Sequence, residues 1–356
     1  MNFNINTDLW QYLAESDKKT VMYGMGNGAD KILKVCEEKG IEICDFFASD
    51  GFVRGHSFHG KRVLSYSEVK EKYGCENIIV LLSFASALPE VIETILNVSS
   101  ECELYAPDVP VFGDTLFDIE FYKKHKSDID EVRSMLSDEE SKHIFDCTIA
   151  YKLTGRVEYL EAAVSDKNEV YRDLLSAQNI KNAIDLGAYN GDTVRELAEY
   201  AEELSGVTAF EPDRRNFKKL TLYSQSEDRF EVEAINAAAW QNNCLLNFDA
   251  GGNRNSNVSN GGKTVEIEAL AVDSVIGEGG VDYIKYDVEG SEREAIIGSE
   301  RTIKSFSPKL LVSLYHRSED IFELPKLVKS INPEYRLYLR RYRYIPAWDL
   351  NLICII

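Results

Sequence analysis

Acidic residues stand at the ends of three strand-like segments in the second half of this 356-residue chain. Asp185 lies in "AIDLGAYNGDT", Glu211 in "FEPD", and Asp287 and Glu289 in "YIKYDVEG". Open α/β sheets bind ligands beyond the carboxyl ends of their strands, so these carboxylates are predicted to share one cleft. Glu211 follows Gly187 by about two dozen positions, where an acid can accept hydrogen bonds from both hydroxyls of a ribose.

The glycine loop from Gly187 to Thr193 indicates which ligand fits. Gly187 and Gly191 are four positions apart, which departs from the dinucleotide fingerprint, and no Lys-Ser or Lys-Thr follows, which excludes a Walker loop. The loop ends in Asp192-Thr193, and a carboxylate that faces the ligand disfavours a phosphate because like charges repel. Acids around one cleft favour a sulfonium and an ammonium, so the sequence predicts S-adenosylmethionine (SAM).

Alternating strands and helices position these residues. Strands are expected at 181–188, 207–213, 230–240, 281–290 and 308–316, and helices at 192–206, 214–225, 291–306 and 318–331. A polar loop with strand-like ends occupies 245–270. Segments 334–344 and 350–356 are predicted to pair as antiparallel strands because the linker between them is short. The pattern is typical of a doubly wound α/β unit over 179–356.

Two further units precede this one. Residues 1–112 alternate in the same way, with strands expected at 18–24, 41–49, 77–84 and 102–107 and helices at 27–40, 65–74 and 88–97. This pattern predicts a Rossmann-like α/β domain. Between them, 113–178 has helical spacing and no evident strand, so it is expected to be a helical connector or cap.

Composition excludes several classes of partner. The formal net charge of −20 argues against nucleic acid and against anionic membranes. No apolar run is long enough to span a bilayer and no export signal is visible at the start, so a cytoplasmic location is expected. The seven cysteines are scattered and form no CxxC pair, which predicts buried reduced thiols rather than disulfides or a zinc site.

The motifs together carry a family resemblance. "AIDLGAYNGDT", "FEPD", "VDYIKYDVEGSEREAIIGS" and "PKLLVSLYHRSEDIFELPKLVKSI" resemble the FkbM-type SAM-dependent methyltransferases over about 180–356, and "DYIKYDVEGSE" is the most specific stretch. A broader likeness, to members with an N-terminal α/β domain, reaches the rest. The resemblance implies a seven-stranded class I methyltransferase sheet with an antiparallel last strand. It also implies O-methylation of a small-molecule or glycan acceptor such as a sugar, a polyketide or another secondary metabolite.

The resemblance assigns cofactor-binding roles by position. The loop would hold the methionine part of SAM, Glu211 the ribose, Ala237 and Ala238 would border the adenine, and Asp287 would lie near the transferable methyl group. The full expected cofactor set is Asp185, Gly187, Ala188, Tyr189, Asn190, Gly191, Asp192, Thr193, Glu211, Pro212, Ala237, Ala238 and Asp287.

His316 and Asp287 are the expected catalytic residues. His316 ends the fifth strand and is a candidate base for a hydroxyl, a role that typically contributes about 10²–10⁴-fold. The alternative is a surface or helix-capping histidine. Lys285 alternates to the same side as Asp287, and pairing with Asp185 or Asp287 is favoured over catalysis. A divalent metal on Asp287 and Glu289 stays open, with no metal ligand assigned.

The N-terminal unit leaves other functions open. Gly24, Gly26 and Gly28 in "VMYGMGNGADKIL" resemble a dinucleotide fingerprint, with Asp45 and Asp50 following. The unit could be a scaffold that forms homo-oligomers, a nucleotide-type module, or part of an NAD-linked sugar-nucleotide oxidoreductase. A non-catalytic nucleotide-binding protein is a further alternative.

Two loops are candidates for binding the acceptor. A basic island is either a solvated loop or an anion site; it consists of Arg54, His56, His59, Lys61 and Arg62. The loop that carries Arg254 and Asn257 is expected to select the acceptor, because such choices reside in loops.

Overall fold

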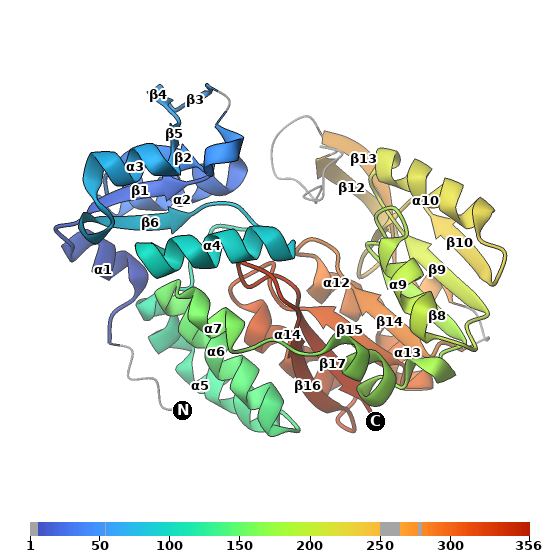
Figure 1. The fold of residues 1–356 in the computed structure, drawn as a ribbon. Helices are drawn as coiled ribbons and strands as arrows, with labels where there is room; N and C mark the ends of the chain where they lie inside the picture. Colours follow the sequence, from blue (N-terminus) through green and yellow to red (C-terminus); the bar gives the residue numbers. More distant parts are fainter. Residues whose placement is uncertain (1–5, 54, 250–263, 277–279) are drawn as a thin grey trace.

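A computed structural model describes residues 6–53, 55–249, 264–276 and 280–356. The expectations for Arg54, Arg254 and Asn257 lie outside the described residues. Two α/β units and a group of helices make up the chain (Figure 1). This confirms the predicted fold class of two doubly wound units.

The C-terminal unit is built on a seven-stranded sheet in the order β10-β9-β8-β14-β15-β17-β16. Five strands are parallel, and β17 runs antiparallel between β15 and β16, as predicted. The bounds are β8 (Asn182–Leu186), β9 (Gly206–Phe210), β10 (Glu231–Ile235), β14 (Tyr283–Tyr286), β15 (Lys309–Ser313), β16 (Arg336–Arg341) and β17 (Leu350–Ile355).

Helices cover both faces of this sheet, because successive side chains of each strand point to opposite faces. Ile284 packs into one buried cluster with the helices after β14 and β15, whereas Tyr283 packs into another with the helix after β8. The helices are α9 (Asp192–Tyr200), α10 (Arg214–Ser226), α11 (Val272–Val275), α12 (Glu292–Ile297), α13 (Glu300–Phe306) and α14 (Asp320–Ile331).

Two predicted elements are divided in the structure. The helix expected over 291–306 is interrupted between α12 and α13, where a Cβ on Gly298 would overlap the carbonyl oxygen of Trp240. The strand expected over 230–240 separates into β10 and β11 (Ala238–Ala239). β11 joins a small sheet with β13 (Thr264–Leu270) and β12 (Cys244–Asp249).

The N-terminal unit has a five-stranded parallel sheet in the order β5-β2-β1-β6-β7. Its strands are β1 (Lys19–Tyr23), β2 (Ile43–Ala48), β5 (Leu64–Ser65), β6 (Ile78–Leu82) and β7 (Glu103–Tyr105), and a hairpin is formed by β3 (Ser57–Phe58) and β4 (Lys61–Arg62). Its helices are α1 (Leu9–Glu15), α2 (Asn27–Glu38), α3 (Tyr66–Tyr73) and α4 (Pro89–Glu101). The predicted alternation is therefore confirmed.

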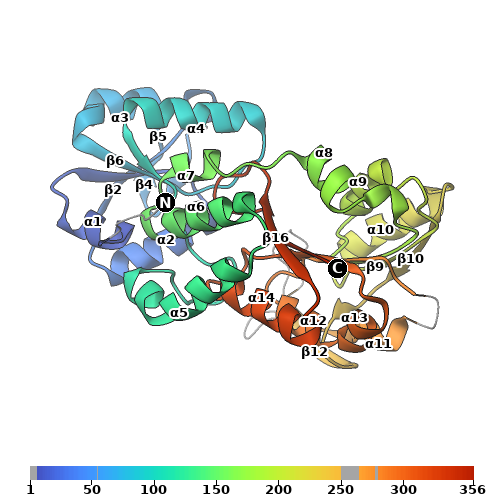
Figure 2. The ribbon, with the colours of Figure 1, turned by 90° about the horizontal axis from the view of Figure 1, so that it is seen from below.

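The segment between the units is helical, as expected. It contains α5 (Ile119–Met135), α6 (Glu139–Thr154), α7 (Val157–Glu161) and α8 (Lys167–Glu169). Phe145 of α6 packs into the core of the C-terminal sheet, whereas Tyr151 of the same helix packs into the core of the N-terminal unit. Figure 2 shows α6 lying between the N-terminal unit and β16. One helix thus connects the two cores.

The two units also meet directly. The loop 342–349 between β16 and β17 inserts Ile345 and Ala347 into the N-terminal core. Ile345 also exchanges backbone hydrogen bonds with Ser86, at 3.1 and 2.9 Å. Elsewhere the amide of Phe112 donates to the carbonyl of His316 at 2.9 Å. The N-terminal unit therefore contacts two loops of the C-terminal sheet.

The prediction that all cysteines are reduced is wrong at one pair. Cys75 and Cys102 form a disulfide, with their Cα atoms 4.6 Å apart. Cys75 precedes β6 and Cys102 ends α4, and folding brings these distant positions together. The other five cysteines are free. Within the described ranges, no helix combines the length and apolar character needed to cross a membrane.

Candidate functional site

A cavity of about 300 Å³ lies at the carboxyl ends of β8, β9, β14 and β15. This is the edge at which the sequence predicted the cleft. Among the predicted residues, those that line the cavity are Gly187, Tyr189, Asp192, Thr193, Glu211, Pro212, Ala237, Ala238 and Asp287. Those that do not line it are Asp185, Ala188, Asn190, Gly191 and His316.

The glycine loop is shaped by contacts with neighbouring strands. A Cβ on Gly187, whose φ is +87°, would overlap the carbonyl oxygen of Asp287, so glycine lets the loops after β8 and β14 touch. The amides of Gly187 and Ala188 donate to the carbonyl of Phe210 at 3.0 and 2.8 Å. The amide of Tyr189 donates to Glu211 Oε2 at 2.9 Å. These amides therefore tie the loop to the end of β9.

Glu211 is the buried acid at the end of β9. Its other oxygen accepts from the amide of Asp213 at 2.8 Å, and burial raises the pKa of Glu211 to about 7. Asn216 lines the same part of the cavity, and its buried Oδ1 has no hydrogen-bond partner among the described residues. The sequence analysis missed Asn216, because a polar residue early in an expected helix has no distinctive signature.

Lys285 pairs with two carboxylates, as the favoured interpretation predicted. Its Nζ lies 3.4 Å from Asp185 Oδ1 and 3.3 Å from Asp287 Oδ2. Burial disfavours the charged lysine, but the two acids outweigh it and raise its pKa. Asp185 also accepts a hydrogen bond from Thr193 Oγ1. Asp185 thus supports the cavity from behind, and burial raises its own pKa.

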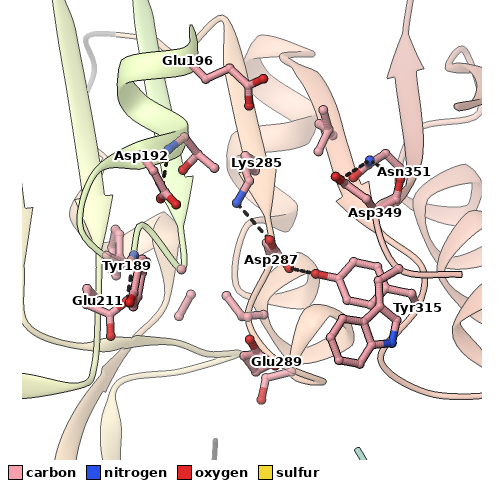
Figure 3. A pocket seen from close by; sticks show the side chains of 18 of the residues that line it. Tyr189, Asp192, Glu196, Glu211, Lys285, Asp287, Glu289, Tyr315, Asp349 and Asn351 are labelled. Atoms are coloured by element: carbon pink, nitrogen blue, oxygen red, sulfur yellow. Dashed lines mark hydrogen bonds and ion pairs between the residues drawn. The ribbon is translucent and has the colours of Figure 1, made fainter. Parts of the chain in front are cut away.

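Asp287 is central to the cavity floor (Figure 3). Its Oδ1 accepts from the hydroxyl of Tyr315 at 2.9 Å, and its Oδ2 faces Lys285. Burial works against ionisation, but Lys285 and His316 lower the pKa of Asp287 below its ordinary value. An ionised carboxylate at this position attracts a cationic ligand.

His316 has a different place from the one expected. It is fully buried and does not line the cavity, so it is not a surface histidine. Its Nδ1 lies 2.9 Å from Glu292 Oε1, and Nε2 lies 3.5 Å from Glu289 Oε2. Burial lowers its pKa, but the surrounding carboxylates dominate and raise the pKa of His316 to about 10.

Aromatic residues form a second wall that sequence reasoning missed. Tyr315, Tyr342, Tyr344 and Trp348 line the cavity, together with Asp349 and Asn351. The rings of Tyr344 and Trp348 are 5.6 Å apart between centroids. The available signal is the aromatic run "RRYRYIPAW" at 340–348, which begins inside the segment expected to be a strand.

Several candidate residues of the N-terminal unit make local contacts. A Cβ on Gly28 would overlap the carbonyl oxygen of Ser83, so the fingerprint glycine serves the packing of the β1 loop against the β6 loop. In the basic island, His59 pairs with Asp30 at 2.8 Å and Arg62 pairs with Glu68 at 2.6 Å. Lys61 donates to the carbonyls of Ile43 and Cys44, both at 2.8 Å.

Comparisons with known proteins agree with the fold of the chain. Residues 185–346 match the model of the methyltransferase FkbM domain. The crystal structure of methyltransferase FkbM from Methylobacillus flagellatus KT aligns with a TM-score of 0.72 at 19% identity, covering 99% of this chain and 94% of that one. That likeness shows a shared fold in both units. No curated protein matches the sequence significantly.

More distant structures align with parts of the chain. An rRNA methylase from Streptococcus thermophilus has a TM-score of 0.36 at 13% identity, covering 54% of this chain and 97% of that one. Fibrillarin from Aeropyrum pernix has a TM-score of 0.33 at 13% identity, covering 52% and 75%.

The fold and the match over residues 185–346 together indicate a SAM-dependent methyltransferase. The strand order and the reversed β17 are the features of that fold on this chain. Within the chain, residues 185–346 carry the match to the methyltransferase FkbM domain.

Proposed function

We propose that the protein transfers a methyl group from SAM to a hydroxyl group of a sugar, a glycan or a hydroxylated secondary metabolite. The observation that carries this proposal is the division of the cavity by Asp287. One side offers Glu211, Asn216 and small alanines, and the other offers aromatic rings with carboxylates.

The first side suits the nucleoside of SAM. Glu211 and the unpartnered Oδ1 of Asn216 are acceptors for ribose hydroxyls. Ala237 and Ala238 are buried and small, which leaves space for a flat base beside them. Asp287 supplies negative charge for a sulfonium. Bound SAM supplies an electrophilic methyl group on a positively charged sulfur.

The second side suits a hydroxylated acceptor. Tyr344 and Trp348 can stack on the apolar face of a sugar ring, while Asp349 and Asn351 offer hydrogen bonds to hydroxyls. A hydroxyl held against Asp287 or Glu289 has a carboxylate to receive its proton as its oxygen attacks the methyl carbon. The carbon–sulfur bond breaks and its electron pair stays on sulfur. Alignment of such partners supplies up to about 7–11 kcal/mol.

A methyl-transfer screen tests this function. The full chain is incubated with SAM and a set of sugars, nucleotide sugars and hydroxylated metabolites, and products that gain one methyl group are detected by mass spectrometry. We expect turnover that Asp287→Asn removes and that Glu37→Gln, on the far surface of α2, leaves unchanged. Calorimetry that finds tight NAD binding and no S-adenosylhomocysteine binding would overturn the proposal in favour of an oxidoreductase.

Two further expectations from the sequence remain proposals. We expect the protein in the cytoplasm, which cell fractionation tests. We also expect self-association, if it occurs, to use the N-terminal unit, and light scattering on the full chain measures its mass.

A further inference from the structure

The loop after β14 places two carboxylates in the cavity, and they differ in how their oxygens are occupied. Asp287 Oδ1 accepts from the hydroxyl of Tyr315 at 2.9 Å, and Asp287 Oδ2 lies 3.3 Å from Lys285 Nζ. Among the described residues, the ion-pair partner of the Glu289 carboxylate is His316, whose Nε2 lies 3.5 Å from Oε2. In Figure 3, dashed lines join Asp287 to Lys285 and Tyr315, and none reaches Glu289. Glu289 therefore has an oxygen, Oε1, that is open to a ligand.

The backbone of Glu289 is strained. Its φ of +53° lies in the left-handed region, which costs a residue with a Cβ about 1–2 kcal/mol. A glycine at this position would avoid that cost, yet the chain carries a glutamate whose side chain lines the cavity. Strained residues of this kind gather at functional sites, where the strain places a side chain that the reaction needs.

We infer that Glu289 is the base that receives the proton of the acceptor hydroxyl, and that His316 is a positioning residue for Glu289. This inference rests on the proposed function and decides between the two carboxylates that it offers. Glu289 lines the cavity, so Oε1 can accept from a bound hydroxyl while Oε2 faces His316. Asp287, whose two oxygens already have partners, is the anion beside the sulfonium.

The acid strengths of the two carboxyls agree with this division. Burial raises the pKa of Glu289 to about 7. Burial also raises the pKa of Asp287, but Lys285 and His316 outweigh it and lower that pKa below its ordinary value. A base is most effective when its pKa lies near the working pH, because it is then both ionised and strong enough to take a proton. Glu289 meets this condition near neutral pH, and Asp287 does not.

His316 is held as a cation next to Glu289. Burial lowers its pKa, but the surrounding carboxylates dominate and raise the pKa of His316 to about 10, so the ring is already protonated at neutral pH and cannot take the acceptor's proton. Its Nδ1 lies 2.9 Å from Glu292 Oε1, which accepts from the amide of Val288 at 2.8 Å. The ring is thus fixed from behind. The titratable groups that act on Glu289 from the surrounding elements are Lys31 of α2, Lys285 of β14, Asp287 of the loop after β14, Glu292 of α12 and His316 after β15.

The proton and the electrons balance in this step. As the hydroxyl oxygen forms its bond to the methyl carbon, the O–H bond breaks and the proton moves to Glu289 Oε1. The carbon–sulfur bond breaks and its electron pair stays on sulfur, which leaves S-adenosylhomocysteine and a methyl ether. The Glu289 side chain is 28% exposed, so the protonated carboxyl can return its proton to solvent.

The pH dependence of methyl transfer tests both roles. The full chain is assayed with the compound of the screen that the wild type methylates fastest, at saturating SAM so that titration of Glu211 does not enter. Wild-type kcat should rise with pH through a midpoint near 7, because only ionised Glu289 takes a proton. Glu289→Gln should lower kcat by about 10²–10⁴-fold, remove this rise and bind S-adenosylhomocysteine as tightly as the wild type in calorimetry. Glu300→Gln, on the surface of α13, is the matched control and should behave like the wild type.

His316→Gln removes the neighbouring positive charge and should move the midpoint of the kcat profile to higher pH, by about one unit or more. An unchanged midpoint would refute the positioning role. Nitrogen-15 NMR of histidine-labelled wild type checks the same point if this variant does not fold: one ring should carry protons on both nitrogens at pH 8, and a spectrum in which every ring is neutral would refute it.

The outcomes separate this inference from the proposed function. A Glu289→Gln variant that keeps the wild-type kcat refutes the base, while the proposed function stands because methyl transfer is intact. If no compound of the screen gains a methyl group, the proposed function falls, and this inference falls with it.

Discussion

The buried Glu211 makes cofactor binding depend on pH. Burial raises the pKa of this carboxyl from an ordinary 4.5 to about 7. The ionised form accepts charge-assisted hydrogen bonds from two ribose hydroxyls with both oxygens, whereas the protonated form presents one oxygen as an O–H donor. Because the pKa is raised, the carboxyl is protonated below pH 7 and ionised above it. The binding-competent fraction therefore grows as the pH rises through 7.

The size of the effect follows from that fraction. With a pKa of about 7, roughly one tenth of the carboxyl is ionised at pH 6 and nine tenths at pH 8, and apparent affinity scales with the competent fraction. We expect S-adenosylhomocysteine to bind about tenfold more weakly at pH 6 than at pH 8. Glu211→Gln should bind more weakly at every pH, by about 1.5–3 kcal/mol, which is typical of hydrogen bonds to a charged group.

Isothermal titration calorimetry at half-unit steps from pH 6 to pH 8 measures both effects. Glu211→Gln should also remove the pH dependence. A wild-type affinity that is flat across this range would refute the reasoning. A glutamine variant that keeps the wild-type slope would assign the titration to another group.

Three further expectations concern stability and the cavity wall. Gly187→Ala should lower the free energy of unfolding by more than the roughly 1–2 kcal/mol that its backbone conformation at φ +87° costs, because the new Cβ would also overlap the carbonyl oxygen of Asp287. Gly206→Ala should lower it by less, because the nearest neighbour of its Cβ is 3.5 Å away. Thermal melts of the two variants compare these effects. Lys285→Met leaves Asp185 and Asp287 without their cation and should lower the free energy of unfolding by about 3–5 kcal/mol at pH 8. Urea unfolding measures this loss, and an unchanged midpoint would contradict the pairing. Ile345→Ala removes a side chain from the N-terminal core and should lower the free energy of unfolding by about 2–5 kcal/mol. It should also shift the fluorescence of nearby Trp348. An emission spectrum identical to that of the wild type would mean that the N-terminal core does not position the aromatic residues of the cavity.

Most of the fold was predictable because its strands are short apolar runs between turn residues. The errors arose where one residue interrupts a continuous pattern. Asn236 divides the expected strand over 230–240, and its side-chain amide donates to the carbonyls of Glu211 and Pro212 instead. The helix over 291–306 reads as continuous, and only the approach of the Trp240 carbonyl to Gly298 explains its break.

The site was predictable where chemistry depends on strand ends. Acids that follow β9 and β14 must meet at one edge of a parallel sheet, so Glu211 and Asp287 were found from the sequence. The burial of His316 was not predictable from the sequence. Alternation along β15 gives the face on which the side chain lies, but not whether Asp287 and Glu289 cover the ring. The aromatic wall depends on Ile345 entering the other unit, and no local pattern encodes that contact.

A crystal structure of the full chain with S-adenosylhomocysteine tests the assignment of the cavity most directly. We expect the ribose on Glu211 and Asn216 and the sulfur beside Asp287, facing the wall of Tyr344 and Trp348. A ligand bound elsewhere, or one whose ribose makes no contact with Glu211, would contradict it.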